Sequence, residues 1–169
     1  MFGLFYPDEY CESAYLIDFE KYYQAGYRGI IFDIDNTLVP HGFPSDEGSR
    51  ALIANLLDMG YDIVLLSNNK KERVELFLKE GRRVKYICKA NKPLPGNYKN
   101  AIKAMNVSEK EALFVGDLLF TDVLGAKKAG IRSVLTKPID PKEEIQIVIK
   151  RRLEKIILKE YFQKTKKGQ

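Results

Sequence analysis

Five short apolar runs alternate with helical segments along most of this chain. Three of them, over residues 30–32, 63–66 and 113–115, are uninterrupted, and two, over residues 84–87 and 131–135, also contain polar residues. Between them, apolar residues recur at helical spacing, as Leu52, Ile53, Leu56 and Leu57 do. Strands that alternate with helices form a parallel sheet with right-handed crossovers. The sequence therefore predicts an α/β fold, a Rossmann-like doubly wound parallel sheet.

Polar side chains follow four of these runs, just beyond the point where each run ends. They are Asp33 and Asp35, then Ser67 and Asn68, then Lys92, and finally Asp117 with Asp122. In such a sheet, ligands bind beyond the carboxyl ends of the strands. Any one cluster is compatible with an ordinary turn. Four clusters at one edge, each suited to a phosphate or its metal, predict a phosphate-handling site.

The first cluster is chemically the most demanding. Asp33 and Asp35 are two positions apart at the end of a strand, so their side chains point to the same side. Two crowded carboxylates raise each other's pKa or require a cation. The alternative is a strand end whose aspartates and Asn36 cap the next turn.

The motif order narrows the interpretation. D-x-D-N-T over 33–37, S-N-N over 67–69, K-P at 92–93 and G-D-x-x-x-T-D over 116–122 resemble the four motifs of the haloacid dehalogenase-like (HAD) phosphatases. More narrowly, the S-N-N motif, the N-terminal leader and the basic tail resemble the uncapped, subfamily IIIA-like YqeG family, which includes mitochondrial phosphatidylglycerophosphate phosphatases. The resemblance implies a HAD-like fold and a Mg²⁺-dependent phosphoric monoester hydrolase.

The resemblance also implies roles for the aspartates. Asp33 is then the nucleophile that forms an aspartyl-phosphate. Asp35 is the general acid and base. Mg²⁺ would be held by Asp33, the main-chain carbonyl of Asp35, and Asp117.

The remaining motif residues would handle the phosphate. Ser67 and the amide of Asn68 would bind phosphoryl oxygens, and Lys92 would add a catalytic and phosphate-binding charge. Asp122, with Asp117, would orient Lys92 or a metal-bound water. Read singly, Ser67 is also compatible with a helix cap and Lys92 with a solvated charge.

The spacing of the motifs bears on the substrate. About thirty residues separate Asp35 from Ser67, and no large insertion lies between Asn69 and Lys92, so a minimal or absent cap is expected. Uncapped members of the superfamily tend to take large or anchored substrates, which agrees with a phosphate on a lipid headgroup. The resemblance to the YqeG family implies phosphatidylglycerophosphate as the leading substrate and a role in phospholipid metabolism. A soluble sugar phosphate, a nucleotide or a polynucleotide end is the alternative. A scaffold with little turnover that binds ribosomal RNA or a protein is the alternative from another class.

Positive charge is concentrated at the C-terminus. Residues 1–141 hold 19 Lys/Arg and 19 Asp/Glu, whereas residues 142–169 hold 9 and 4. Residues 142–162 predict an amphipathic helix with a basic flank, followed by a frayed tail. Its apolar face is expected to pack on the sheet, and its basic residues are candidates for contact with an anionic membrane. That face holds Ile145, Ile149, Leu153, Ile156 and Ile157.

Three parts of the chain are thus expected. They are an aromatic-rich leader over 1–28 packed on the core, the catalytic core over 29–141, and the basic helix and tail over 142–169. In the leader, Pro7 and Asp8 predict a short helix through Ala14 or Leu16, and Asp18 predicts a cap for another that ends at Gly26. The alternative for the aromatic leader is an amphipathic foot at a lipid interface.

The remaining composition points to the cytoplasm. Cys11 and Cys88 cannot form a disulfide framework and lack the neighbours of a zinc site. The N-terminus does not have the pattern of a signal peptide, and no apolar run approaches the ~20 residues of a spanning helix. A cytoplasmic protein is expected, with peripheral contact at the inner face of the membrane. His41 and Lys89 are expected to be ordinary loop residues, with substrate contact left open.

Overall fold

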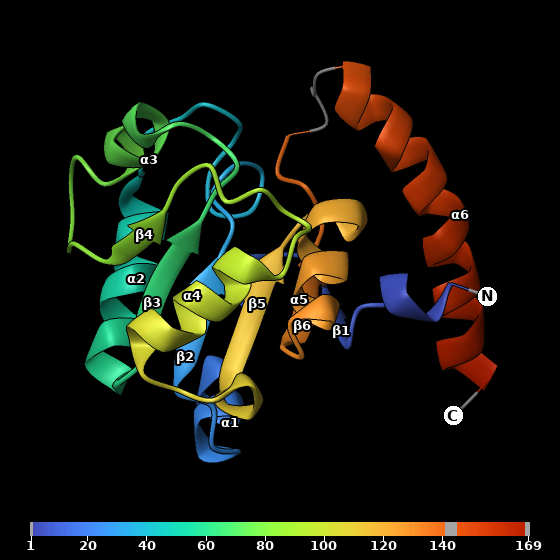
Figure 1. Ribbon diagram of the computed structural model, residues 1–169, viewed down its shortest axis with the longest axis horizontal. Helices are drawn as coiled ribbons and strands as arrows, with labels where there is room; N and C mark the ends of the chain where they lie inside the picture. The colour runs from blue at the N-terminus through green and yellow to red at the C-terminus, as the bar shows by residue number, and fades with distance from the viewer. Residues whose placement is uncertain (1, 141–144, 168–169) are drawn as a thin grey trace.

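The computed structural model of the protein describes residues 2–140 and 145–167. Within these ranges the chain forms a six-stranded sheet in the order β1-β6-β5-β2-β3-β4, and every neighbouring pair is parallel (Figure 1). The strands are β1 (Glu9–Cys11), β2 (Gly29–Phe32), β3 (Asp62–Leu66), β4 (Lys85–Ile87), β5 (Ala112–Gly116) and β6 (Arg132–Thr136). The predicted doubly wound α/β fold is confirmed.

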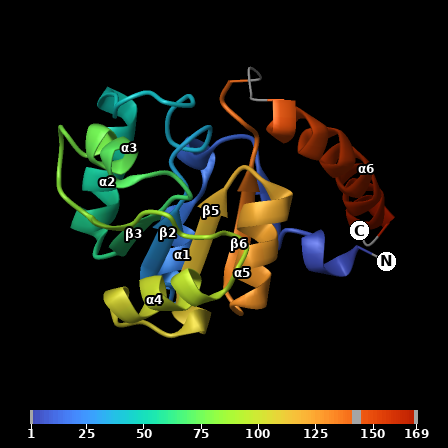
Figure 2. The same cartoon turned by 45° about the horizontal axis from the view of Figure 1, so that its top comes forward.

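Helices cover both faces of this sheet. The helices are α1 (Phe19–Gln24), α2 (Glu47–Met59), α3 (Lys71–Phe77), α4 (Gly96–Met105), α5 (Leu124–Lys128) and α6 (Ile145–Lys167). Short helical turns are η1 (Gly3–Phe5), η2 (Ala14–Leu16), η3 (Glu109–Glu111) and η4 (Leu119–Val123). Buried side chains of α1, α2 and α3 belong to the core cluster on one face, and those of α4 and α5 belong to the cluster on the other. Figure 2 shows the arrangement of these helices around the sheet.

The central strand β2 is buried along its whole length. Ile30 and Phe32 point into one core cluster and Ile31 into the other, because successive side chains of a strand alternate between faces. Phe32 lies opposite Leu65 of β3 and Val115 of β5. The chain leaves β2 toward β3 and later returns to β5 on the other side. The carboxyl end of β2 is therefore the switch point at which ligands bind in such sheets.

Local capping fixes the ends of two helices. Asp46 caps α2, since its carboxylate accepts a hydrogen bond from the N–H of Ser49 at 2.7 Å. Gly60 ends α2 with a left-handed backbone at φ 105°. Asp18 caps α1 through the N–H of Lys21 at 2.9 Å. The cap that the sequence predicts at Asp18 is confirmed.

The leader differs from the prediction. The helix expected from Pro7 is wrong, because residues 9–11 form β1 and extend the sheet beyond β6, with Tyr10 opposite Leu135. Asp8 stabilises this pairing, because its carboxylate accepts a hydrogen bond from the N–H of Ser133 at 2.8 Å. The unpaired backbone groups at the edge of β6 favour an extended leader over a helix.

The aromatic side chains of the leader are engaged within the chain. Phe19 and Tyr22 are buried in the core under β2. The Tyr10 ring packs edge-on against Phe162 of α6 with centroids 5.2 Å apart, and the Tyr6 hydroxyl donates to Glu160 at 2.6 Å. The leader thus connects the sheet to α6.

The C-terminal helix is present, but its orientation is not the predicted one. Ile149, Leu153 and Ile156 are 57%, 52% and 62% exposed, whereas Ile157 is buried. The expectation that all these residues pack on the sheet is therefore wrong for three of them. The face with Glu154 packs instead, because the Glu154 carboxylate accepts a hydrogen bond from the buried N–H of Leu119 at 2.7 Å.

Parts of that prediction fall outside the described residues. These are positions 142–144, the last two residues of the chain, and the side chain of Ile145. The tail expected to fray from Lys164 is helical through Lys167. No described helix has both the length and the apolar content to cross a membrane, and the thiols of Cys11 and Cys88 are free.

Gly125 of α5 lies against the buried ring of Tyr98, whose hydroxyl donates to the Thr121 carbonyl at 2.7 Å. A Cβ at this position would overlap the hydroxyl and the ring of Tyr98. We expect Gly125→Ala to lower the free energy of unfolding by about 1–3 kcal/mol in urea denaturation. Gly96→Ala is the control, since its Cβ meets no atom within 4 Å. Unchanged stability of Gly125→Ala would contradict this packing.

Candidate active site

Residues from four strand ends line one pocket of about 220 Å³ at the carboxyl edge of the sheet. Asp33 follows β2 directly, Ser67 follows β3, and Asp117 follows β5. Lys92 arrives on the loop after β4. The sequence-predicted residues that line the pocket are Asp33, Asp35, Ser67, Asn68, Lys92 and Asp117. The convergence expected from a parallel sheet is observed.

A buried ammonium group ties these loops together. Lys92 Nζ lies 2.7 Å from Asp33 Oδ1 and 2.8 Å from Asp122 Oδ1, and its side chain is only 4% exposed. Burial alone would lower the pKa of Lys92, but the carboxylates of Asp122 and Asp33 raise it above its usual value. Lys92 therefore carries a fixed positive charge next to Asp33.

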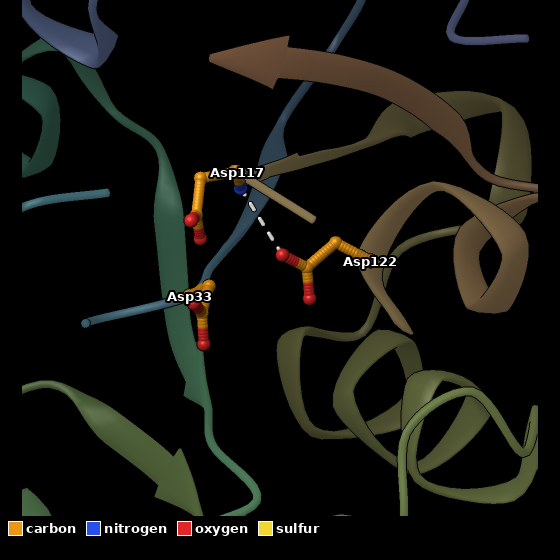
Figure 3. A group of neighbouring side chains, drawn as sticks. All are labelled: Asp33, Asp117 and Asp122. Atoms are coloured by element: carbon orange, nitrogen blue, oxygen red, sulfur yellow. Dashed lines mark hydrogen bonds between the residues drawn. The ribbon is translucent and has the colours of Figure 1, made fainter. Parts of the chain in front are cut away.

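Asp122 positions this ammonium and the neighbouring loop. Its second oxygen accepts hydrogen bonds from the N–H groups of Asp117 and Leu118, both at 3.1 Å, the first of which is drawn in Figure 3. A Cβ at residue 116 would overlap the Asp122 carboxylate, which explains why Gly116 ends β5. Asp122 is thus saturated with donors from the protein.

Three carboxylates lie close together at the pocket, two of which line it. Oxygens of Asp33, Asp117 and Asp122 lie within 4.8 Å of one another, and all three residues are buried (Figure 3). Burial raises the pKa of Asp33 well above its usual value despite the Lys92 charge. Burial also raises the pKa of Asp117 to about 7, against the lowering effect of Arg151. Three carboxylates beside two cations leave one excess negative charge when all are ionised.

This donor set fits a divalent cation. Asp122 does not line the pocket, and its oxygens accept hydrogen bonds from the Lys92 ammonium and from two main-chain N–H groups. Asp33 and Asp117 do line the pocket, so the oxygens suited to a metal belong to them. Among the described residues, no hydrogen-bond donor is found for the second oxygen of Asp33. The Thr37 hydroxyl orients Asp117 through a 3.2 Å hydrogen bond to Oδ1. Hard oxygen ligands with excess negative charge suit Mg²⁺.

Asp35 is held by Asn69, the last residue of the S-N-N motif, and by Arg73, which the sequence did not single out. Its Oδ2 accepts a hydrogen bond from the side-chain amide of Asn69 at 2.7 Å. Its Oδ1 accepts two from the guanidinium of Arg73, at 2.8 and 3.1 Å, and one from the N–H of Gly42 at 2.8 Å. These contacts fix the direction of a carboxylate that lies on a turn rather than on a strand.

Ser67 and Asn68 lie where the sequence places them, at the end of β3. Ser67 is 1% exposed, and its hydroxyl accepts a hydrogen bond from the N–H of Asn69 at 3.1 Å. The Asn68 side chain reaches the main chain of Lys92 and accepts a hydrogen bond from its N–H at 2.7 Å. Asn68 therefore also holds the loop that presents the lysine.

The structure places His41 at the pocket and Lys89 away from it. His41 lines the pocket, and its Nδ1 lies 3.7 Å from Asp35 Oδ1. Lys89 is exposed and does not line the pocket; its N–H donates to the Asn69 carbonyl at 2.8 Å.

The C-terminal helix also reaches the site. The guanidinium of Arg151 pairs with the Asp117 carboxylate and main-chain carbonyl, and it lies 3.1 Å from Glu154. Ile147 and Lys150 of α6 line the pocket. Arg151 could not be predicted from the sequence, because it is one of several basic residues on one helix and no local pattern distinguishes it from its neighbours.

Comparison with known proteins places this site in a family. The family of haloacid dehalogenase-like hydrolases matches over residues 41–130. The Bacillus subtilis (strain 168) protein "Probable phosphatase YqeG" is 32% identical over 157 residues, which cover 91% of this chain and 90% of that protein. The chain belongs to the haloacid dehalogenase-like hydrolases. Within that family, this HAD-like hydrolase is a phosphatase.

Further similarities agree with this assignment. "Phosphatidylglycerophosphate phosphatase 1, chloroplastic/mitochondrial" of Arabidopsis thaliana is 32% identical over 168 residues; the match covers 88% of this chain but only 45% of that protein. The crystal structure of the Bacillus subtilis HAD-hydrolase YfnB has a TM-score of 0.51 at 14% identity, covering 71% of this chain and 91% of that one. An uncharacterized Listeria monocytogenes protein has a TM-score of 0.53 at 15% identity, covering 70% and 86%. These two solved structures share the fold of this chain.

Removal of the Arg151 guanidinium would leave the buried Asp117 carboxylate without this cation. Arg151 stabilises the ionised form of the Asp117 carboxylate. Its contribution to the free energy of unfolding is therefore present above the pKa of Asp117 and is lost as pH falls through about 7. In a metal-free buffer, we expect Arg151→Met to lower the free energy of unfolding by about 3 kcal/mol at about pH 8.5 and by much less at about pH 5.5. Urea denaturation at the two pH values measures the difference.

Arg152→Met is the matched control, because Arg152 is an exposed neighbour on the same helix. It should change stability little, and equally, at both pH values. A loss in Arg151→Met that does not depend on pH would contradict the role of Arg151 as the partner of an ionised Asp117.

Proposed function

We propose that this HAD-like phosphatase hydrolyses a phosphomonoester through a covalent intermediate on Asp33, with Mg²⁺ as cofactor. The physiological substrate in this proposal is a lipid phosphate, with phosphatidylglycerophosphate as the leading candidate. The observation that carries the proposal is the convergence of Asp33, Asp35, Lys92 and Asp117 on one largely buried edge of the sheet. Such an arrangement suits a phosphoryl group and its counter-charges.

In the first step, an Asp33 carboxylate oxygen forms a bond to phosphorus while the ester P–O bond breaks. Asp33 is suited to this role because it lines the pocket and Lys92 pairs with only one of its carboxylate oxygens. The carboxyl group of Asp35 gives its proton to the leaving alkoxide. Hydrogen bonds from Arg73 and Asn69 fix the orientation of the Asp35 carboxyl group for this transfer.

In the second step, a water molecule attacks the aspartyl-phosphate. The Asp35 carboxylate takes a proton from this water as its oxygen bonds to phosphorus, and the bond to Asp33 breaks. Inorganic phosphate leaves and both aspartates return to their starting states. Ser67, the amide of Asn68 and the Lys92 ammonium are the donors proposed for the non-bridging oxygens in both steps.

The proposed cofactor site consists of the Asp33 and Asp117 carboxylates and the main-chain carbonyl of Asp35. When bound, Mg²⁺ would neutralise charge between the nucleophile and the phosphate. The raised pKa values of Asp33 and Asp117 support this part of the proposal, because a buried carboxylate pair of this kind is costly to ionise without a cation.

Three observations support a lipid substrate. The Arabidopsis thaliana relative is named a phosphatidylglycerophosphate phosphatase. The chain forms only a loop, α2 and β3 between Asp35 and Ser67, and only α3, β4 and loops between Asn69 and Lys92, so neither of these described segments contains a cap domain. The C-terminal segment carries the excess positive charge of the chain, which suits attachment to the anionic inner face of a membrane.

The proposal is tested by phosphate release from a generic aryl phosphate and from phosphatidylglycerophosphate in mixed micelles, with Mg²⁺ and with a chelator. We expect release from both substrates to need Mg²⁺ and to fall to background in Asp33→Asn, since the amide cannot replace the nucleophile. Asp62→Asn is the matched control, because Asp62 is exposed at the opposite end of β3; it should keep wild-type activity.

The outcomes separate the parts of the proposal. Activity on the aryl ester alone would retain the mechanism and reject the lipid. Full activity with the chelator would reject the metal. Activity that survives in Asp33→Asn would reject the covalent mechanism.

A further inference from the structure

The outward face of α6 presents two parallel rows of side chains. An apolar ridge consists of Ile149, Leu153 and Ile156, spaced four and three residues apart, so they lie on one side of the helix. All three are more than half exposed. Monomeric proteins seldom leave such a contiguous apolar row in water unless it binds something.

A basic ridge runs beside the apolar one. Arg152, Lys155 and Lys159 are exposed and lie on the adjacent strip of the same helix. The acidic residues in the described part of α6 do not oppose this charge: Glu154 is buried against Leu119, and Glu160 accepts a hydrogen bond from Tyr6 and pairs with Lys164. The outward face is therefore apolar along one strip and positively charged along the next.

Contacts on the opposite side of α6 hold this face toward solvent. Arg151 and Glu154 bind the Asp117 loop and Leu119, and Ile157 is buried in a small cluster with residues of η4. Figures 1 and 2 both show α6 outside the two helical layers, beyond the β6–β1 edge, with the leader on its inner side. No described element lies over the two ridges.

We infer that the outward face of α6 docks on an anionic lipid bilayer, with the apolar ridge inserted at the interface and the basic ridge on the lipid headgroups. Helices that combine a Leu/Ile strip with Lys/Arg neighbours lie in the interfacial plane in this way. The inference deepens the proposed function, on which it rests for the idea of a lipid substrate. Ile147 and Lys150, in the first two turns of the same helix, line the catalytic pocket, so docking would hold the pocket near the membrane.

Two other occupants fit the face less well. A second copy of this chain that paired through the same face would bring two basic ridges together, which like-charge repulsion disfavours. A nucleic acid would use the basic ridge but not the adjacent aliphatic one. A bilayer that contains anionic lipid matches both ridges at once.

The test is co-sedimentation with vesicles that contain phosphatidylglycerol and with vesicles of pure phosphatidylcholine. Phosphatidylglycerol carries no phosphomonoester, so binding is measured without turnover. We expect the wild type to bind the anionic vesicles and to bind the zwitterionic ones weakly. Leu153→Gln/Ile156→Gln should weaken binding roughly tenfold or more, and Lys155→Gln/Lys159→Gln roughly fivefold for each charge removed.

Matched controls separate the face from general surface properties. Leu16→Gln/Leu76→Gln changes exposed apolar residues elsewhere, and Lys103→Gln/Lys110→Gln changes exposed charges elsewhere. Both should bind vesicles as the wild type does. Glutamine is a good helix former, so circular dichroism should show unchanged helix content in the α6 variants. All four variants should hydrolyse the soluble aryl phosphate at the wild-type rate.

Several results would overturn the inference. They are failure of the wild type to bind anionic vesicles, equal loss of binding in the controls, or a dimer in size-exclusion chromatography that Leu153→Gln/Ile156→Gln dissociates. Binding that depends on the ridges, in a protein that does not hydrolyse phosphatidylglycerophosphate, would retain the docking face and reject only the proposed substrate. Hydrolysis of phosphatidylglycerophosphate in micelles by a protein that does not bind vesicles would retain the proposed substrate and reject the docking face.

Discussion

The contact on which the site depends is the buried Lys92 ammonium between Asp33 and Asp122. Lys92 lies on the loop after β4, Asp33 on the turn after β2, and Asp122 on the segment after β5. A charge buried to this extent is stable only when it is paired, and removal of one partner of such a pair typically costs about 3–5 kcal/mol. One side chain therefore fixes the relative positions of three loops that are distant in the sequence.

The same edge of the sheet also holds more negative than positive charge. Asp122 uses both of its oxygens to position Lys92 and the loop of Asp117. Burial raises the pKa values of the Asp33 and Asp117 carboxyl groups above their usual range. Asp122 therefore suits a structural role, whereas Asp33 and Asp117, which line the pocket, suit a cation and a phosphoryl group, although all three aspartates are buried.

Much of this arrangement could be predicted from the sequence. The alternation of apolar runs and helical segments predicts the sheet, and the polar residues after each run predict which edge carries the site. Those signals are local and periodic. Arg73 and Arg151 could not be predicted, because their roles depend on where two helices dock, and neither position differs locally from other basic residues in the same helix.

Two structural predictions failed for the same reason. The three-residue strand β1 forms because β6 offers an unpaired edge, which no pattern within residues 9–11 reveals. The apolar periodicity of α6 predicted a buried face, but the polar contacts of Arg151 and Glu154 turn that face outward. In both cases a partner distant in the sequence decided the local structure.

The central claim is that Asp33 takes the phosphoryl group, and trapping that group tests the claim most directly. In Asp35→Asn, an aryl phosphate with a good leaving group can still phosphorylate Asp33, but the base that activates water is missing. Acid quenching followed by peptide mass spectrometry should find one phosphoryl group on the peptide that contains Asp33, and none when Asp33→Asn is added. A phosphoryl group on another residue, or none in a variant that still releases the aryl alcohol in a single turnover, would contradict the account.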